Sequence, residues 1–212
     1  MSAPKTSSAD VGLPPDAFEK IDDGDDLAFY APPRLVTHID EIAVAALTSF
    51  YREIVPEGGR VLDLMSSWVS HLPEDRRYTQ VVGHGMNAQE LAANPRLDRW
   101  FVQDLNGYPA LPLESGAFDA ALCCVGVQYL QRPLEVFAEV RRVLAPDTRV
   151  VVSYANRCFP TKAVAIWRAL DMSDQASLIG MYLNRSGFSA VEARMLSDGS
   201  RGDPLIAVVA LA

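Results

Sequence analysis

Short apolar runs alternate with helical patterns along most of this chain. The apolar runs are RVLDLM (60–65), QVVGHG (80–85), FVQDL (101–105), FDAALCCVGV (118–127) and RVVVSYA (149–155). The helical patterns cover residues 39–54, 87–95 and 133–146, with a short helix also predicted near residues 68–75. Alternation of strands and helices predicts a parallel α/β sheet whose crossovers are right-handed.

The C-terminal part of the chain extends this order. Two more helices are predicted at residues 161–171 and 174–188, the second closing at Gly187. Two apolar strands at residues 190–196 and 204–212 follow closely on one another, which favours an antiparallel pair. The whole pattern predicts an α/β fold with a single doubly wound, mostly parallel seven-stranded sheet. Helices lie on both faces, and a helical segment precedes the first strand.

The N-terminal part of the chain differs in composition from the rest. The net charge is −8, and residues 1–30 hold seven acidic side chains against two basic ones. Residues 1–26 are rich in Ser, Pro, Ala and Asp, which predicts a disordered acidic tail. Residues 27–212 form one domain in this interpretation, with a helical cap at 27–56 and a core at 58–212.

The acidic run IDDGDD (21–26) resembles the start of a calcium-binding loop. Such a loop needs a bidentate Glu at its twelfth position, and counting from Asp22 places Pro33 there. A solvated acidic linker is therefore the favoured interpretation of this run.

The composition argues against several classes of function. An acidic chain without a basic patch is a poor candidate for binding nucleic acid or an anionic membrane. Neither a signal peptide nor a membrane span is recognisable, and three cysteines do not form a disulfide framework, so a cytoplasmic enzyme is expected. Cys158 and the histidines at 38, 71 and 84 are far apart in the sequence, so no metal site is predicted. Nothing in the residues distinguishes a monomer from a dimer.

Polar residues stand directly after the predicted strands. Ligands of parallel α/β sheets bind beyond the carboxyl ends of the strands, so these residues are the candidates for a site. They are Asp63 and Met65–Ser67 after the first strand, Gly85–Asn87 after the second, Asp104 after the third, Cys124–Val125 after the fourth and Asn156–Arg157 after the fifth.

Three segments resemble a known family in this order. They are VLDL (61–64), FVQDLNGYPALPL (101–113) and FDAALCCVGVQYLQRPLEVFAEVRRVLAP (118–146), the last followed by a further strand. The chain is similar over about residues 58–212 to the class I S-adenosylmethionine (SAM) dependent methyltransferases of the type 11 group. The resemblance implies the Rossmann-like methyltransferase fold, SAM as cofactor and S-adenosylhomocysteine (SAH) as product.

The resemblance also implies roles for individual residues. Asp63 matches the acid that answers the ammonium of SAM, and Asp104 matches the acid that accepts from the adenine amino group. Capping of a following helix is the alternative for both. The remaining implied cofactor contacts are the Leu105 backbone amide, the apolar Met86 and Val125 on the adenine faces, and the backbone of Cys123 and Cys124; core packing is the alternative for these side chains.

Two positions depart from the family pattern. Met65, Ser66 and Ser67 stand where the family has a Gly-x-Gly turn, and a non-glycine residue forced to a positive φ costs about 1–2 kcal/mol. The serine hydroxyls are expected to compensate by bonding to the cofactor carboxylate. Gly85 stands where the family often has an acid for the ribose diol, and Asn87 is expected to bind the diol instead.

The acceptor side of the site is predicted from residues flanking these loops. The candidates are Tyr30 and Arg34 before the core, Gln128 after the fourth strand, and Asn156 and Arg157 after the fifth. Helix capping and surface salt bridges are the alternatives. If the nucleophile carries a proton, His38 or Tyr129 is expected to be the general base.

These observations lead to two hypotheses of different kinds. The first is a methyltransferase that acts on a small molecule by in-line transfer. The second is a non-catalytic or regulatory SAM-binding relative, suggested by the missing glycines. A nicotinamide-dependent oxidoreductase would need G-x-G-x-x-G after the first strand, and a serine hydrolase would need G-x-S-x-G; neither motif is present.

Overall fold

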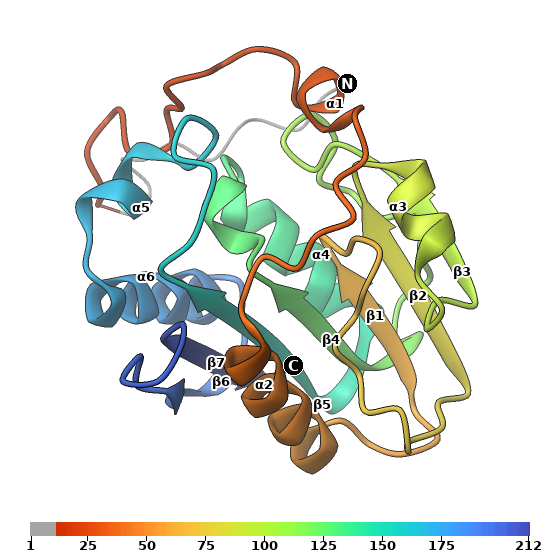
Figure 1. Ribbon diagram of the computed structural model, residues 1–212. Helices are drawn as coiled ribbons and strands as arrows, with labels where there is room; N and C mark the ends of the chain where they lie inside the picture. Colours follow the sequence, from red (N-terminus) through yellow and green to blue (C-terminus); the bar gives the residue numbers. More distant parts are fainter. Residues whose placement is uncertain (1–11) are drawn as a thin grey trace.

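A computed structural model describes residues 12–212 and has one seven-stranded sheet with helices on both faces (Figure 1). The strand order is β3-β2-β1-β4-β5-β7-β6. The first five strands are parallel, and β7 runs antiparallel to both β5 and β6. The predicted fold class is therefore confirmed, including the antiparallel pair at the C-terminal end.

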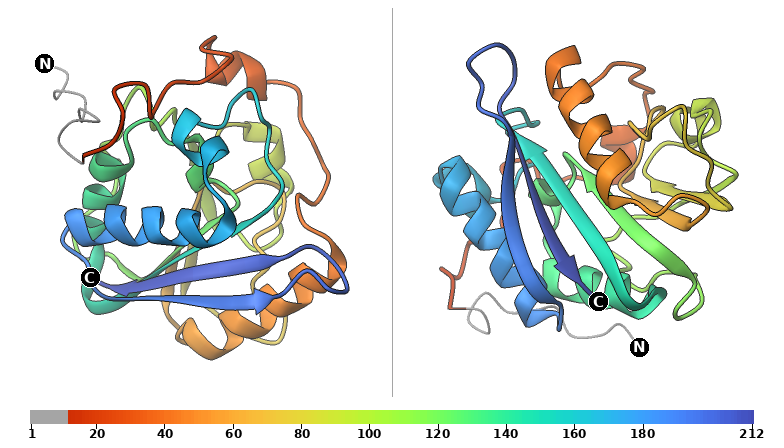
Figure 2. Two further views of the ribbon diagram at one scale, coloured as in Figure 1. Left: turned by 90° about the vertical axis from the view of Figure 1, so that its left-hand side faces the viewer. Right: turned by 90° about the horizontal axis from the view of Figure 1, so that it is seen from below.

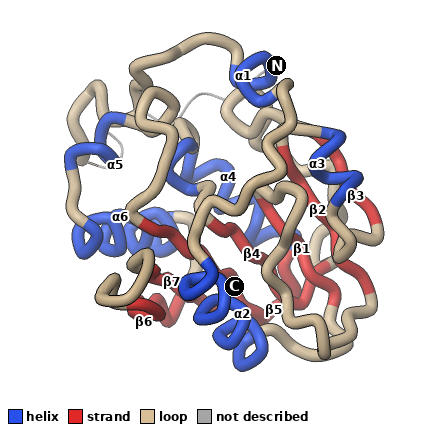
Figure 3. The backbone as a smooth tube through the Cα atoms, in the orientation of Figure 1, coloured by secondary structure: helices blue, strands red, loops and turns tan. Residues whose placement is uncertain are grey.

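The elements follow the predicted order closely (Figure 3). The strands are β1 (Arg60–Leu64), β2 (Gln80–Gly85), β3 (Arg99–Val102), β4 (Phe118–Cys124), β5 (Leu144–Ala155), β6 (Ser189–Ser197) and β7 (Leu205–Leu211). The helices are α1 (Asp26–Tyr30), α2 (Glu41–Ile54), α3 (Ala88–Ala93), α4 (Pro133–Val143), α5 (Ala165–Ala169) and α6 (Met172–Arg185), with a 3₁₀ turn at Val127–Tyr129.

The central strands are apolar on both faces because both faces are covered. Leu62 of β1 faces the layer made by α4, α5 and α6, whereas its neighbour Val61 faces α2. Figure 2 shows α6 and α2 on opposite sides of the sheet. Alternate side chains of one strand point to opposite faces, so a sheet buried on both sides needs the nearly continuous apolar runs seen in the sequence.

Polar caps fix where the helices begin. The Asn87 side chain accepts from the backbone amides of Gln89 and Glu90, which confirms the predicted start of α3. Asp40 caps α2 and Asp171 caps α6 in the same way. Pro133 occupies the first position of α4, where its missing N–H costs nothing.

Two helix predictions were wrong. Residues 65–79 form a loop of turns between β1 and β2, so the short helix predicted near 68–75 does not exist. The polar groups of this loop bond elsewhere: Trp68 Nε1 donates to the Val36 carbonyl, and Asn94 Nδ2 donates to the Ser67 carbonyl. The helix predicted over 161–171 is limited to the single turn of α5.

The prediction of an acidic tail over residues 1–26 also needs correction. Residues 1–11 lie outside the described residues, but residues 12–26 pack against the core. Ala17 is buried, the Ile166 amide donates to the Ala17 carbonyl, and the Asp22 amide donates to the Thr161 carbonyl. The part of the chain that the structure describes contains no helix long and apolar enough to cross a membrane.

Candidate functional site

A cavity of about 270 Å³ lies at the carboxyl ends of β1, β2 and β4. Its outer wall comes from the N-terminal segment, which we define as residues 12–38, and from the loop after β5. The site residues predicted from the sequence that line the cavity are Tyr30, Arg34, His38, Asp63, Met65, Ser66, Ser67, Gly85, Met86, Asn87, Asp104, Leu105, Cys124, Val125, Gln128, Tyr129 and Arg157.

Two predicted site residues do not line this cavity. Cys123 is buried in the core cluster shared with α4 and α6, because it alternates with Cys124 and faces the other side of β4. Asn156 is exposed to solvent just beyond the end of β5. The assignment of Asn156 to the acceptor is therefore corrected, whereas the backbone contact of Cys123 with the cofactor stays a prediction.

Asp63 is a buried carboxylate at the end of β1. Its side chain accepts from the Ser66 hydroxyl at 2.6 Å, and Ser70 also bonds to it. Within residues 12–212 no lysine or arginine pairs with it. Burial raises the pKa of Asp63 to about 6, because the charged form has lost its water. A cation brought into the cavity would restore the interactions that this carboxylate lacks.

The turn after β1 adopts a glycine-like conformation without a glycine. Met65 has a φ of 56°, in the left-handed region. The Ser66 hydroxyl donates to Asp63, and the Ser67 hydroxyl donates to Glu90 at 2.6 Å. Both hydroxyl protons are thus used within the protein, which corrects the expectation that these serines bond to the cofactor carboxylate.

The end of β2 has no room for the acid that the family often places there. A Cβ added at Gly85 would lie 2.4 Å from the Ser66 carbonyl oxygen. The Asn87 amide is fully engaged, since its oxygen caps α3 and its Nδ2 donates to the carbonyls of Tyr30 and Ala31. The expectation that Asn87 binds the ribose diol is therefore wrong for this arrangement.

The loops after β3 and β4 form the next part of the cavity. Both carboxylate oxygens of Asp104 accept backbone amides, from Asn106 and Gly107, so this side chain caps a turn. Leu105 is buried, whereas Met86 is only partly buried where it lines the cavity. Val125 has a φ of 45° and, like Met65 and His71, lines the cavity in the left-handed region.

Aromatic rings gather at the end of the cavity next to the N-terminal segment. Phe159, from the loop after β5, lies 6.3 Å from the Tyr30 ring, 6.1 Å from the Tyr129 ring and 5.7 Å from the His38 ring. The Arg34 guanidinium lies 5.4 Å from the same ring, and it donates to the Phe29 carbonyl. This end suits a flat or apolar molecule.

The two predicted bases differ in their protonation. Burial lowers the pKa of His38 below its usual value, so its imidazole is neutral at neutral pH and can accept a proton. Burial raises the pKa of Tyr129 to about 12, and the Tyr129 hydroxyl accepts from the Phe159 amide. Tyr129 therefore stays protonated and is a poor general base.

Two further candidates for the acceptor side have protein partners. Arg157 Nε donates to Asp203 at 2.8 Å, in the surface salt bridge that was the alternative for this residue. Gln128 Nε2 donates to the Val125 carbonyl. The Gln128 side-chain oxygen is buried and has no hydrogen-bond partner among the described residues.

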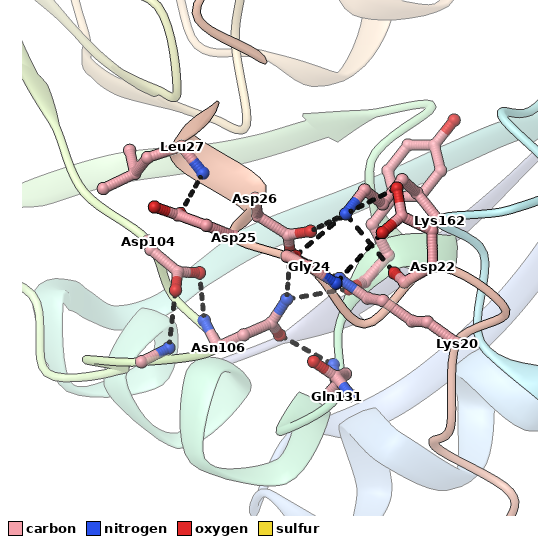
Figure 4. Close-up of polar contacts among 12 residues, drawn as sticks. Lys20, Asp22, Gly24, Asp25, Asp26, Leu27, Asp104, Asn106, Gln131 and Lys162 are labelled. Carbon is pink, nitrogen blue, oxygen red and sulfur yellow. Dashed lines mark hydrogen bonds and ion pairs between the residues drawn. The ribbon is translucent and has the colours of Figure 1, made fainter. Parts of the chain in front are cut away.

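An ionic cluster around the buried Lys162 side chain holds the N-terminal segment in place (Figure 4). Lys162 Nζ lies 3.1 Å from carboxylate oxygens of both Asp22 and Asp26, and Lys20 also bonds to Asp26. Asn106 Nδ2 donates to Asp26 at 3.2 Å. The run interpreted as a solvated linker is thus fastened to the loops after β3 and β5.

The sequence prediction missed several residues of the cavity. They are Asp26, Thr37, Ser70, His71, Glu90, Asn106 and Phe159. Glu90 lies in the first turn of α3, and nothing in its sequence position indicates that it lines a cavity. The three histidines, scattered in the sequence, all line the cavity, although in the described part of the chain no group of His, Cys, Asp and Glu could hold a metal ion.

Comparisons with known proteins agree with this fold. Residues 67–152 match a family model described as a methyltransferase domain, and no curated protein matches the chain. A SAM-dependent methyltransferase from Aquifex aeolicus has a TM-score of 0.59 at 15% identity, covering 80% of this chain and 90% of that one. A SAM-dependent methyltransferase from Mesorhizobium loti has a TM-score of 0.55 at 18% identity, covering 81% of this chain and 100% of that one. The [4+2]-cyclase SpnF has a TM-score of 0.60 at 16% identity, covering 87% of this chain and 89% of that one.

These likenesses establish the class I methyltransferase fold, and the cavity can be tested against the cofactor of that fold. Asp63, a buried carboxylate that has no cationic partner within residues 12–212, suits an ammonium group. The partly apolar surface near Met86 and Val125 suits the faces of a heteroaromatic base. The residues present therefore fit the cofactor at these two ends, while Asn87 offers nothing to the ribose.

Proposed function

We propose that this chain, which has the class I methyltransferase fold and matches the methyltransferase domain family, transfers a methyl group from SAM to a small-molecule acceptor. The observation that carries the proposal is Asp63, a buried carboxylate that lines the cavity at the end of β1 and has no cationic partner in the described part of the chain. When bound, SAM would supply an electrophilic methyl group on a sulfonium. The protein must then align an acceptor with that methyl group and exclude water.

In this proposal the aromatic end of the cavity holds the acceptor. Tyr30, Tyr129 and Phe159 would pack against its flat or apolar part. The side-chain oxygen of Gln128, which has no partner among the described residues, would accept a hydrogen bond from an O–H or N–H group of an acceptor that reaches it. His38 would take the proton released as the new bond to the methyl carbon forms, because its imidazole is neutral and lies at this end.

Calorimetry with SAM and SAH tests cofactor binding. We expect both to bind, and absence of binding of either at millimolar concentration would refute the proposal. A panel of oxygen, nitrogen and carbon nucleophiles, followed by detection of SAH, then tests turnover.

The second candidate is a SAM-binding protein that does not transfer the methyl group. It is favoured by one observation, namely that the Ser66, Ser67 and Asn87 groups expected to contact the cofactor are bonded within the protein. Tight binding of SAM without turnover on the full panel would favour this candidate. Measured methylation of any acceptor would exclude it.

His38→Asn separates the base from the binding site. For an acceptor that carries a proton, we expect kcat to fall by about 100-fold or more, since general-base catalysis contributes that much. The affinity for SAH should stay within about threefold of the unaltered protein. An unchanged kcat would show that the acceptor needs no base or that another residue supplies it.

A further inference from the structure

The turn after β1 is bonded to a buried histidine of the neighbouring strand. The Met65 amide donates to His84 Nδ1 at 3.1 Å, and the Ser66 amide donates to the His84 carbonyl at 2.6 Å. His84 Nε2 lies 2.9 Å from the Gln103 carbonyl oxygen, which has no proton to give. The ring therefore carries its proton on Nε2 and accepts on Nδ1, so one tautomer satisfies both contacts.

The surroundings of His84 keep the ring neutral and fixed. Its side chain is 1% exposed and packs 5.2 Å from the Phe101 ring. Burial lowers the pKa of His84 to about 4, so Nδ1 remains an acceptor at neutral pH. A protonated ring would carry a hydrogen on Nδ1 and could not accept the Met65 amide.

Met65 needs such support because it is not a glycine. A side chain at a φ of 56° strains the backbone, and the surrounding structure has to maintain that conformation. Two neighbouring glycines, Gly126 and Gly85, leave room for this turn. A Cβ at Gly126 would lie 2.8 Å from the Met65 Cβ, and one at Gly85 would lie 2.4 Å from the Ser66 carbonyl oxygen.

We propose that His84 is the positioning residue of the cofactor-binding turn, its Nδ1 holding Met65 in the left-handed conformation that a glycine would adopt unaided. The inference rests on the proposed function, because it assigns this turn to the cofactor. His84 lies in β2 and bonds to the Met65 amide, so its effect on ligand binding is indirect, through the conformation of Met65. The turn is thereby formed before any ligand binds.

A pair of amide variants separates the two nitrogens of the ring. His84→Asn offers an oxygen near the place of Nδ1, whereas His84→Gln reaches the Gln103 carbonyl and leaves Met65 without an acceptor. We expect His84→Asn to keep the SAH affinity within about threefold and His84→Gln to weaken it about tenfold or more. Equal affinities of the two variants would overturn the proposal.

Amide hydrogen exchange without ligand gives a readout that does not depend on SAH binding. The Met65 amide should be protected in the unaltered protein and in His84→Asn, and should exchange at least about tenfold faster in His84→Gln. Unchanged protection in His84→Gln would overturn the proposal even if SAH bound. If the unaltered protein binds neither SAM nor SAH, the proposed function fails while the exchange result still tests the role of His84.

Met65→Gly completes the test as a double-mutant cycle. Glycine adopts the positive φ without strain, so the loss of SAH affinity caused by His84→Gln should shrink to about threefold or less in the Met65→Gly background. A merely structural histidine would lower stability equally in both backgrounds. An equal loss of affinity in both backgrounds would contradict the positioning role.

Discussion

Asp63 shows how one residue can be costly for the fold and useful for binding. Its pKa is raised from 3.8 to about 6 by burial, so the folded protein resists ionising it. Stability is therefore greatest below the unfolded pKa and falls as the pH rises towards about 6. Above that pH the ionised carboxylate costs the fold about 3 kcal/mol, which a bound ammonium group would offset.

Asp63→Asn should exchange affinity for stability. The variant keeps an oxygen for the Ser66 hydroxyl and removes the buried charge, so we expect a higher Tm than that of the unaltered protein at neutral pH. SAH should bind at least about tenfold more weakly. In the unaltered protein, the affinity should fall by about tenfold per pH unit below about pH 6, because the carboxyl group becomes neutral. Calorimetry and thermal melts measure both effects.

The pH dependence of SAH affinity in Asp63→Asn shows whether Asp63 is the titrating group. The SAH affinity of Asp63→Asn should show no step near pH 6, since the titrating group is gone. A step of the same size in both proteins would assign the titration to another residue. A lower Tm for Asp63→Asn would mean that Asp63 stabilises the fold.

At the scale of elements, the N-terminal segment depends on contacts with loops distant in the sequence. The side chains of Lys20 and Lys162 are 2% and 1% exposed, and both bond to Asp26 (Figure 4). Lys162 Nζ also donates to the Gly24 carbonyl at 3.0 Å. One lysine thus satisfies a carboxylate and a backbone carbonyl of the segment that walls the cavity.

Lys162→Met should release this segment while leaving the sheet intact. The substitution keeps the apolar length of the side chain and removes the donor, so protease cleavage within residues 12–30 should accelerate by about tenfold or more. The control is Arg52→Gln, which breaks an exposed salt bridge to Asp75 and should leave cleavage unchanged. Equal cleavage rates in Lys162→Met and the unaltered protein would show that other contacts hold the segment.

The elements that could be predicted are those whose pattern is local. FDAALCC and RVVVSYA became buried strands because continuous apolar runs need two covered faces. The loop containing Trp68 was predicted as a helix, but its polar groups bond to Val36 and Asn94. Likewise, nothing near Lys20 indicates that its carboxylate partner is shared with Lys162.

The candidate site could be predicted where topology alone decides it. Asp63 and Asp104 follow parallel strands, so both lie at the same edge of the sheet, and both line the cavity. The sequence does not show which polar groups already have partners within the protein. Asn87, for example, donates its side-chain amide to the carbonyls of Tyr30 and Ala31, which are distant in the sequence. Phe159 and His71 come from irregular loops whose paths depend on tertiary contacts.

For the whole molecule, the N-terminal segment and the loops after the five parallel strands meet at the carboxyl edge of a sheet packed on both faces (Figures 1 and 2). Residues of all these segments line the cavity. A ligand there contacts residues from Asp26 in the N-terminal segment to Phe159 in the loop after β5. Binding to the folded state alone stabilises it in proportion to the logarithm of ligand excess. The thermal stability of the whole chain therefore reports on this one cavity.

SAH should raise the Tm clearly. At about 100 times its Kd, SAH adds about 2.7 kcal/mol, which corresponds to a rise of about 5–10 °C for a chain of this size. A nicotinamide dinucleotide at the same concentration serves as the control and should give no rise. An equal rise with both compounds would indicate a general nucleotide site rather than one for SAM.

The buried lysines also determine how the protein responds to ionic strength. Dissolved ions screen charges that water reaches, and Lys20 and Lys162 are almost completely covered. Added salt should therefore leave the N-terminal segment bonded to the loops that it contacts. Arg157, whose side chain is 62% exposed beside the cavity, is screened normally. Any salt dependence of ligand affinity would then originate at exposed charges such as Arg157, and the N-terminal segment would keep its position from low to high salt concentration.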